Sequence, residues 1–249
     1  MHPTPTLMAI PGIMSDHRTW QAVIAAMTHR FPQVHVADTS TDNTLPAMAA
    51  RALAATTGDL IIIAHSMGGR VAMEMGRQAP ERIRAMVLCS TAAEPAAPDE
   101  ATKRYARIAE ANAGMAAYAV HWAPKVLSKS GAQNPELLAT IRRMVEDCPP
   151  EVHARQNLAL LYRPDALAYL PELAFPALLV TGDEDHLSTV PVHAEIATAL
   201  PNAESHVVPG GGHLLTFEKP AEVAQIIDHW LTRRQLAQCA ARSGAATAP

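Results

Sequence analysis

Residues 60–78 combine a buried strand, a tight turn and a helix, and they constrain the fold more than any other stretch. Leu60 to Ile63 is a continuous apolar run rich in isoleucine, which is typical of a strand buried on both faces of a parallel sheet. A turn with Ser66 at its centre follows, and residues 71–78 predict a helix that ends before Pro80. A strand that passes directly into a helix indicates a unit of a parallel α/β sheet.

The same alternation of strands and helices runs through most of the chain. Strands are expected at 7–10, 34–37, 60–63, 85–89, 177–181 and 204–208. Helices are expected at 19–28, 45–55, 71–78, 192–200 and 221–236. We therefore predict an α/β fold built on a mostly parallel, doubly wound sheet of about six strands.

Between residues 94 and 172 the alternation stops. This stretch has helical patterns and no convincing strand, with helices expected at 99–120, 135–146 and 152–162. We interpret it as a helical lid inserted over the carboxyl edge of the sheet. The expected domains are a core formed by residues 1–93 and 173–239, a cap at 94–172, and a disordered tail at 240–249.

Ser66 has the sequence context of a catalytic nucleophile. A serine on a sharp strand-to-helix turn needs small neighbours, and Ala64 and Gly68 stand two residues to either side of it. Its hydroxyl becomes a strong nucleophile only when a base takes its proton, and the base needs a third group to orient it. The alternative interpretation is an ordinary serine- and glycine-containing loop.

Other polar residues follow the carboxyl ends of predicted strands, where ligands bind in parallel sheets. His213 is the expected base, because three glycines before it let its loop fold close to Ser66. Asp185 is the expected acid, after the strand at 177–181. Its alternatives are Asp183, Glu184 and Glu94, each of which also follows a strand.

The developing negative charge on an attacked carbonyl oxygen requires two N–H donors. We expect these to be the backbone N–H groups of Met67, directly after the nucleophile, and of Ile13, in the turn after the first strand. An adaptable apolar pocket is expected from Met14, Tyr118, Trp122 and Phe217 together with Met67, although each could instead be core packing.

Composition narrows the possible partners. The formal charge is −4 and no basic cluster is present, which argues against nucleic acid and favours a small-molecule substrate. Three widely spaced cysteines and no visible signal peptide predict a cytoplasmic protein with reduced thiols, and no apolar run is long enough to enter a membrane. The twelve histidines lack metal-binding spacing, so we expect no metal and no cofactor. The oligomeric state is not readable.

The chain resembles the α/β-hydrolase fold superfamily, and within it the small bacterial serine hydrolases that include esterases and enol-lactonases. The resemblance covers about residues 6–236 and is carried by Pro11-Gly12-Ile13, Ala64-His65-Ser66-Met67-Gly68-Gly69, Gly182-Asp183-Glu184-Asp185 and Gly212-His213. In such families the aspartate three residues after the glycine is the usual acid, which implies Asp185. The chain departs from the family in its loop at 38–44, which lacks glycine, and in having six expected strands instead of eight.

The resemblance implies a Ser-His-Asp hydrolase that cleaves a small carboxylic ester or lactone through an acyl-enzyme. Cleavage of a C–C bond, an amide or a thioester would use the same residues, since lid contacts decide between them. A different class, a ligand-binding protein without useful turnover, is the remaining alternative.

Overall fold

The computed structural model describes residues 4–236 and contains a six-stranded parallel sheet with the order β2-β1-β3-β4-β5-β6. The strands are β1 (Thr6–Ile10), β2 (Val34–Val36), β3 (Leu60–His65), β4 (Ile83–Cys89), β5 (Ala177–Gly182) and β6 (Ala203–Val208). All strand pairs are parallel, as expected for strands joined by helical crossovers. The predicted α/β fold and its sheet are therefore confirmed.

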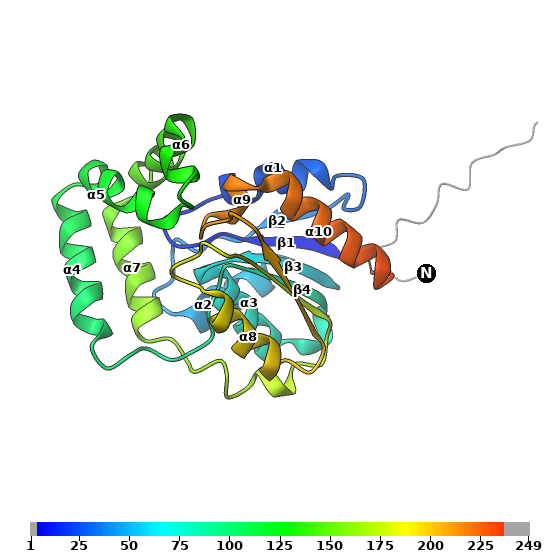
Figure 1. The fold of residues 1–249 in the computed structure, drawn as a ribbon. Coiled ribbons are helices and arrows are strands. Elements are labelled where there is room, and N and C mark those ends of the chain that lie inside the picture. The colour runs from blue at the N-terminus through cyan, green and yellow to red at the C-terminus, as the bar shows by residue number, and fades with distance from the viewer. Residues whose placement is uncertain (1–3, 237–249) are drawn as a thin grey trace, which may run out of the picture.

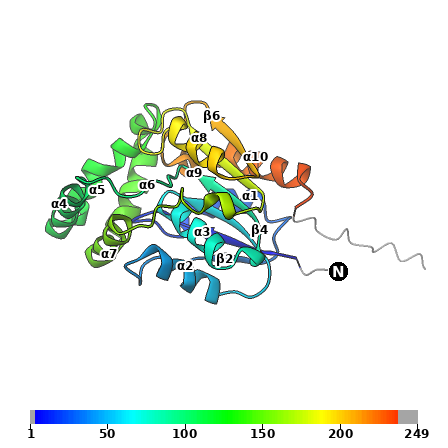
Figure 2. The same ribbon diagram turned by 90° about the horizontal axis from the view of Figure 1, so that it is seen from below.

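Helices cover both faces of this sheet (Figures 1 and 2). The helices of the core are α1 (Arg18–Ala26), α2 (Leu45–Ala54), α3 (Met67–Gln78), α8 (Val190–Ala199), α9 (Leu215–Glu218) and α10 (Pro220–Arg233), with a short 3-10 turn at Pro80–Arg82. Side chains alternate between the faces: Ile62 packs in a cluster with α2 and α3, whereas Ile61 and Ile63 pack in a cluster with α1 and α10. Each buried strand thus joins two apolar layers.

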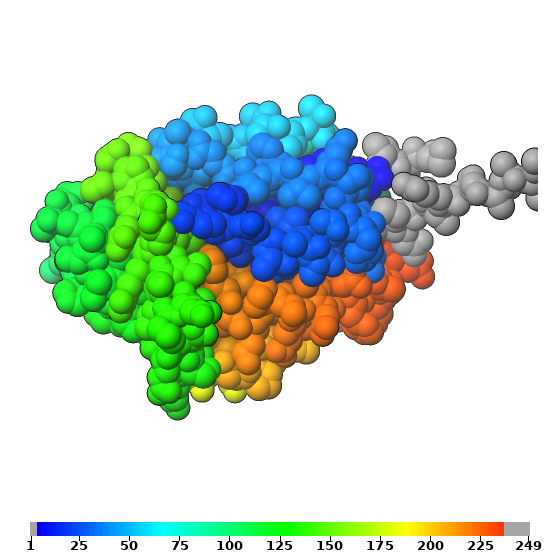
Figure 3. Space-filling model, turned by 90° about the horizontal axis from the view of Figure 1, so that it is seen from above, coloured from blue at the N-terminus to red at the C-terminus, as the bar shows by residue number. Residues whose placement is uncertain are grey.

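Residues 94–172, called the helical segment below, contain α4 (Glu100–Ala113), α5 (Met115–Trp122), α6 (Pro135–Glu146) and α7 (Pro150–Leu161), plus 3-10 turns at Ala123–Val126, Gly131–Gln133 and Leu170–Glu172. Figure 1 shows these green helices beyond one end of the sheet. Figure 3 shows the segment lying against both the blue N-terminal and the orange C-terminal part of the core. The helical segment therefore contacts both the N-terminal and the C-terminal part of the core.

Three differences from the predicted elements stand out. The helix expected at 99–120 is two helices, because Gly114 separates α4 from α5 and glycine is a poor helix former. Helix α3 begins at Met67, directly after the nucleophile candidate, and not at Val71. The short helix α9, which contains Phe217, was not expected. The predicted tail at 240–249 lies outside the described residues.

Candidate active site

Ser66 occupies a strained turn between β3 and α3. Its φ of 54° and ψ of −119° are unusual for a residue with a side chain. The surrounding backbone holds this conformation: the Ser66 N–H donates to the Cys89 carbonyl at 3.0 Å, and the Thr91 hydroxyl donates to the Ser66 carbonyl at 2.7 Å. The serine side chain is thereby presented at the carboxyl edge of the sheet.

Small residues are needed around this turn because neighbouring backbone approaches closely. A Cβ on Gly68 would lie 2.5 Å from the carbonyl oxygens of Ile10 and Pro11. A Cβ on Gly12 would lie 2.9 Å from the Nδ1 of His65. Close contact therefore favours glycine at both positions, and for Gly68 this confirms the small residue expected from the sequence.

His213 connects Ser66 to Asp185. The Ser66 hydroxyl lies 2.9 Å from Nε2 of His213, and Nδ1 of His213 lies 3.0 and 3.1 Å from the two carboxylate oxygens of Asp185. With Nδ1 protonated, the ring donates to Asp185 and its Nε2 can accept the serine proton. His213 is 6% exposed and Asp185 is 3% exposed, so water does not compete for these hydrogen bonds.

Asp185 is held in its ionised form. Burial alone would raise its pKa, but the hydrogen bond and charge of His213 and the backbone N–H groups of Ser188 and Leu187 outweigh it, and the pKa lies below its ordinary value. The alternative acids have other partners: Asp183 accepts from the Gly210 N–H, Glu184 from the Lys129 N–H, and Glu94 pairs with Arg70.

Two further buried histidines support this arrangement. Nε2 of His65 donates to the His213 carbonyl at 2.8 Å, and burial lowers the His65 pKa to about 3, so the ring is neutral near pH 7. Nε2 of His193 accepts from the Thr91 N–H at 2.9 Å, and burial lowers its pKa to about 4. The neutral rings of His65 and His193 therefore hold the backbone of His213 and of Thr91 in place through hydrogen bonds.

Ile13 and Met67, the expected donors to the oxyanion, line the same cavity as Ser66. The residue after Ile13 is also in a left-handed conformation, since Met14 has a φ of 54°. The Met14 N–H donates at 2.9 Å to the side chain of Gln156, which comes from α7 in the helical segment. Sequence reasoning missed Gln156, because a contact across 142 residues leaves no local pattern.

A cavity of about 410 Å³ opens above Ser66 and His213. Met14, Tyr118 and Trp122 line it as expected from the sequence. Phe217 does not line it and is corrected here: its helix α9 places it against the apolar cluster of Val126, Ile141 and Leu214. The expectation of an apolar wall is also incomplete, because charged side chains form much of the lining.

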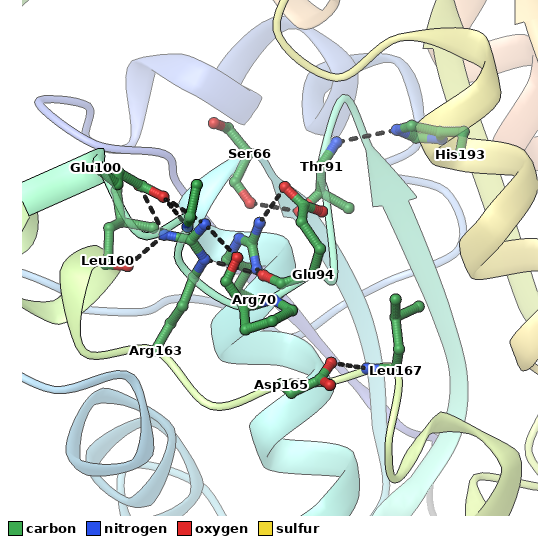
Figure 4. Close-up of polar contacts among 12 residues, drawn as sticks. Ser66, Arg70, Thr91, Glu94, Glu100, Leu160, Arg163, Asp165, Leu167 and His193 are labelled. Carbon is green, nitrogen blue, oxygen red and sulfur yellow. Dashed lines mark hydrogen bonds and ion pairs between the residues drawn. The ribbon is translucent and has the colours of Figure 1, made fainter. Parts of the chain in front are cut away.

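One wall of the cavity carries three arginines that are each at most 9% exposed, Arg70, Arg104 and Arg163. Figure 4 shows Arg70 and Arg163 with their acidic partners. Arg163 binds both oxygens of Glu100 at 2.7 and 2.8 Å, and Arg104 binds the same carboxylate. Arg70 makes a looser ion pair of 3.2 Å with Glu94, whose side chain is half exposed. Arg70 stands four residues after Ser66, one helical turn along α3, and this spacing was the signal that could have identified it.

The charges in this wall affect one another. Burial and then the charge of Arg163 lower the pKa of Arg70 to about 10, although Glu94 partly opposes this, and the side chain stays cationic at pH 7. Burial would raise the pKa of Glu100, but hydrogen bonds and charges from Arg163 and Arg104 lower it to about 2. The wall therefore carries buried, permanently charged groups close to the candidate nucleophile.

Within residues 4–236, no group of three or more His, Cys, Asp or Glu side chains is arranged to hold a metal ion. No helix in this range has the length and apolar character needed to cross a bilayer.

Several known proteins are similar to this chain in sequence and in fold. A Bacillus subtilis protein assigned provisionally as 2-succinyl-6-hydroxy-2,4-cyclohexadiene-1-carboxylate synthase is 25% identical over 69% of this chain and 65% of its own length. The chain spans less than two thirds of this and the other curated relatives it matches. An esterase from Thermogutta terrifontis has a TM-score of 0.84 at 28% identity, covering 92% of this chain and 90% of the esterase.

The enol-lactonase of Burkholderia xenovorans has the same fold, with a TM-score of 0.82 at 21% identity over 92% of each chain. The family model described as serine aminopeptidase, S33 (Hydrolase_4), matches residues 21–220, which is most of the chain. This chain therefore belongs to the S33 serine aminopeptidase family and has the fold of the α/β-hydrolase superfamily.

Proposed function

We propose that this protein is a serine hydrolase that cleaves a small carboxylic ester or lactone with Ser66, His213 and Asp185. The observation that carries the proposal is the continuous set of contacts from Ser66 Oγ through His213 to the buried Asp185, opening into a cavity. This is the arrangement that a weak hydroxyl nucleophile needs in order to be activated.

In the proposed reaction, the Ser66 Oγ bonds to the substrate carbonyl carbon while its proton passes to Nε2 of His213. The N–H groups of Ile13 and Met67 stabilise the negative oxygen of the tetrahedral intermediate. The bond to the leaving alkoxide breaks, and His213 returns the proton to that oxygen. Water then attacks the acyl-enzyme, gives one proton to His213, and releases the carboxylic acid as Ser66 regains its proton.

We further propose that the substrate carries an acidic group. The cavity lining has five cationic side chains, Arg70, Arg104, Arg107, Lys125 and Arg163, and three anionic ones, Glu94, Glu100 and Glu110, a net of +2 in a chain whose formal charge is −4. A low-dielectric cavity concentrates such a field on its ligand. The similar Thermogutta esterase was solved with malate, a dicarboxylate, bound.

The helical segment is the proposed cap, joined to a core of residues 1–93 and 173–239. Residues of α4, α5 and α7 line the cavity together with Ser66, so the segment shapes the space for a small-molecule substrate. Hydrolysis of a C–C bond, amide or thioester remains open to the same groups, because the cap contacts choose the substrate.

Labelling with a fluorophosphonate probe tests the proposal. We expect intact-mass measurement to find one adduct on the wild-type protein and none on Ser66→Ala, because only an activated serine attacks phosphorus at a useful rate. Nitrophenyl esters of increasing acyl length would then measure the size of the pocket. A folded wild-type protein that gains no adduct and hydrolyses no ester would contradict the proposal and favour a ligand-binding role.

A further inference from the structure

The turn after β1 is held from two sides, by the core before Ile13 and by the helical segment after it. On the core side, the indole N–H of Trp20 donates to the Ile10 carbonyl at 3.0 Å. On the other side, the side-chain oxygen of Gln156 accepts from the Met14 N–H at 2.9 Å. Ile13, the proposed oxyanion donor, lies between these two anchors.

The peptide that joins Ile13 to Met14 is fixed at both of its polar atoms. Its N–H donates to Gln156, and its carbonyl oxygen accepts from the Ser15 hydroxyl at 3.1 Å. A rotation of this peptide would break both hydrogen bonds. Met14 has a left-handed φ of 54°, a conformation that a residue with a side chain keeps only when its surroundings impose it.

Gln156 can impose this conformation because the oxygen and the nitrogen of its side-chain amide are both hydrogen-bonded. Its Nε2 donates to the Thr39 carbonyl at 3.2 Å, in the loop after β2. Gln156 and Met14 are each 2% exposed, and Thr39 is 4% exposed, so water cannot replace these contacts. The Met14 side chain also packs with Ala111, Tyr118 and Val145 from three other helices of the segment.

From these contacts we propose that Gln156 is a positioning residue, through which the helical segment sets the orientation of the Ile13 N–H. The inference rests on the proposed hydrolase function and adds a role to it. Gln156 does not touch the reacting atoms. It holds the strained turn so that the donor is already in place when negative charge develops on the carbonyl oxygen.

The test variant is Gln156→Met, which keeps the side-chain volume and removes both hydrogen bonds. The control is Arg155→Gln on the same helix, because Arg155 donates to the Ser40 carbonyl in the loop after β2 and, among residues 4–236, has no hydrogen bond to the turn at Ile13. For Gln156→Met, we expect kcat for a nitrophenyl ester to fall about 10- to 100-fold with KM nearly unchanged, since the donor acts in the transition state. Arg155→Gln should keep kcat within about twofold.

Hydrogen exchange gives a second readout that does not depend on catalytic activity. The Met14 amide of the wild-type protein should be protected, and in Gln156→Met this protection should be lost while the strands of the sheet stay protected. Fast exchange of Met14 in the wild type, or equal kcat losses in both variants, would overturn the inference. Absence of hydrolysis by the wild-type protein would instead overturn the proposed function.

Discussion

Gly69 and Thr91 approach each other so closely that a Cβ on Gly69 would lie 2.4 Å from the Thr91 hydroxyl oxygen. A shift of Thr91 would break two hydrogen bonds, because its hydroxyl donates to the Ser66 carbonyl and its N–H donates to His193. The first turn of α3 therefore depends on a glycine at this position for both packing and the conformation of Ser66.

This contact predicts the effect of Gly69→Ala. We expect the free energy of unfolding to fall by about 1–3 kcal/mol, as for overpacking of a tight core site, and kcat to fall at least ~10-fold because Ser66 shifts. Urea denaturation and ester hydrolysis measure the two effects. Gly114→Ala is the control, since a Cβ there meets nothing within 4 Å, and its stability should change by less than about 0.5 kcal/mol. Equal stability of the two variants would contradict this account.

Ser66, His213 and Asp185 should act as one unit. Ser66→Ala and His213→Ala should each lower kcat by on the order of 10³-fold or more, and the double variant should be little worse than either. Asp185→Asn should also lower kcat strongly, because His213 loses the carboxylate that fixes the tautomer of its ring. Steady-state kinetics of the four variants measure this. If Glu94→Gln lost the activity while Asp185→Asn kept it, the assignment of the acid would be wrong.

Arg70 should determine a preference for acidic substrates. We expect the ratio of kcat/KM for 4-nitrophenyl hydrogen succinate to that for 4-nitrophenyl butyrate to exceed 1 and to fall with added salt. Arg70→Gln should reduce this ratio about 10-fold, roughly the value of one charge-assisted hydrogen bond. Arg77→Gln on the same helix should leave it unchanged, because Arg77 pairs with Glu74 away from the cavity. An unchanged ratio in Arg70→Gln would contradict the proposal of an acidic substrate and leave the proposed hydrolase function standing.

Glu100 should make stability depend on pH in acid. Its pKa in the folded protein is about 2, below the ordinary 4.5. Its contribution is therefore complete above pH 4.5 and is lost as the pH falls toward 2, and it amounts to at most about 3 kcal/mol. Urea midpoints measured between pH 5 and pH 2 should fall less steeply for Glu100→Gln than for the wild type. Parallel curves for the two proteins would show that Glu100 does not carry this dependence.

Much of the fold could be predicted because buried parallel strands leave a strong local signal. Leu60 to Ile63 is apolar at every position, so its strand was evident, and the residues that follow each strand were expected at one edge of the sheet. The structure brings Ser66, Asp185 and His213 together at that edge. The parallel direction of the strands was enough to suggest that the loops after β3, β5 and β6 would meet.

The details of the helical segment could not be predicted in the same way. Helical periodicity shows that a helix has an apolar face, but not which side chains of that face meet the core. The contact of Gln156 with Met14 and the shared ion pairs of Glu100 depend on how α4 and α7 dock, which no spacing encodes. Phe217 was misplaced for a related reason, because a four-residue helix such as α9 has too few residues to show a period.

The position of β6 at the edge of the sheet has a consequence for the newly made chain. Ser66 precedes His213 by 147 residues, and His213 follows β6, the last strand both in the sequence and in the order of the sheet. During synthesis from the N-terminus, the serine turn can be complete while the histidine that activates it has not yet left the ribosome. An unfinished or C-terminally truncated chain that lacks His213 therefore lacks the base that the proposed reaction requires, and the proposed site is complete only once β6 has joined the sheet.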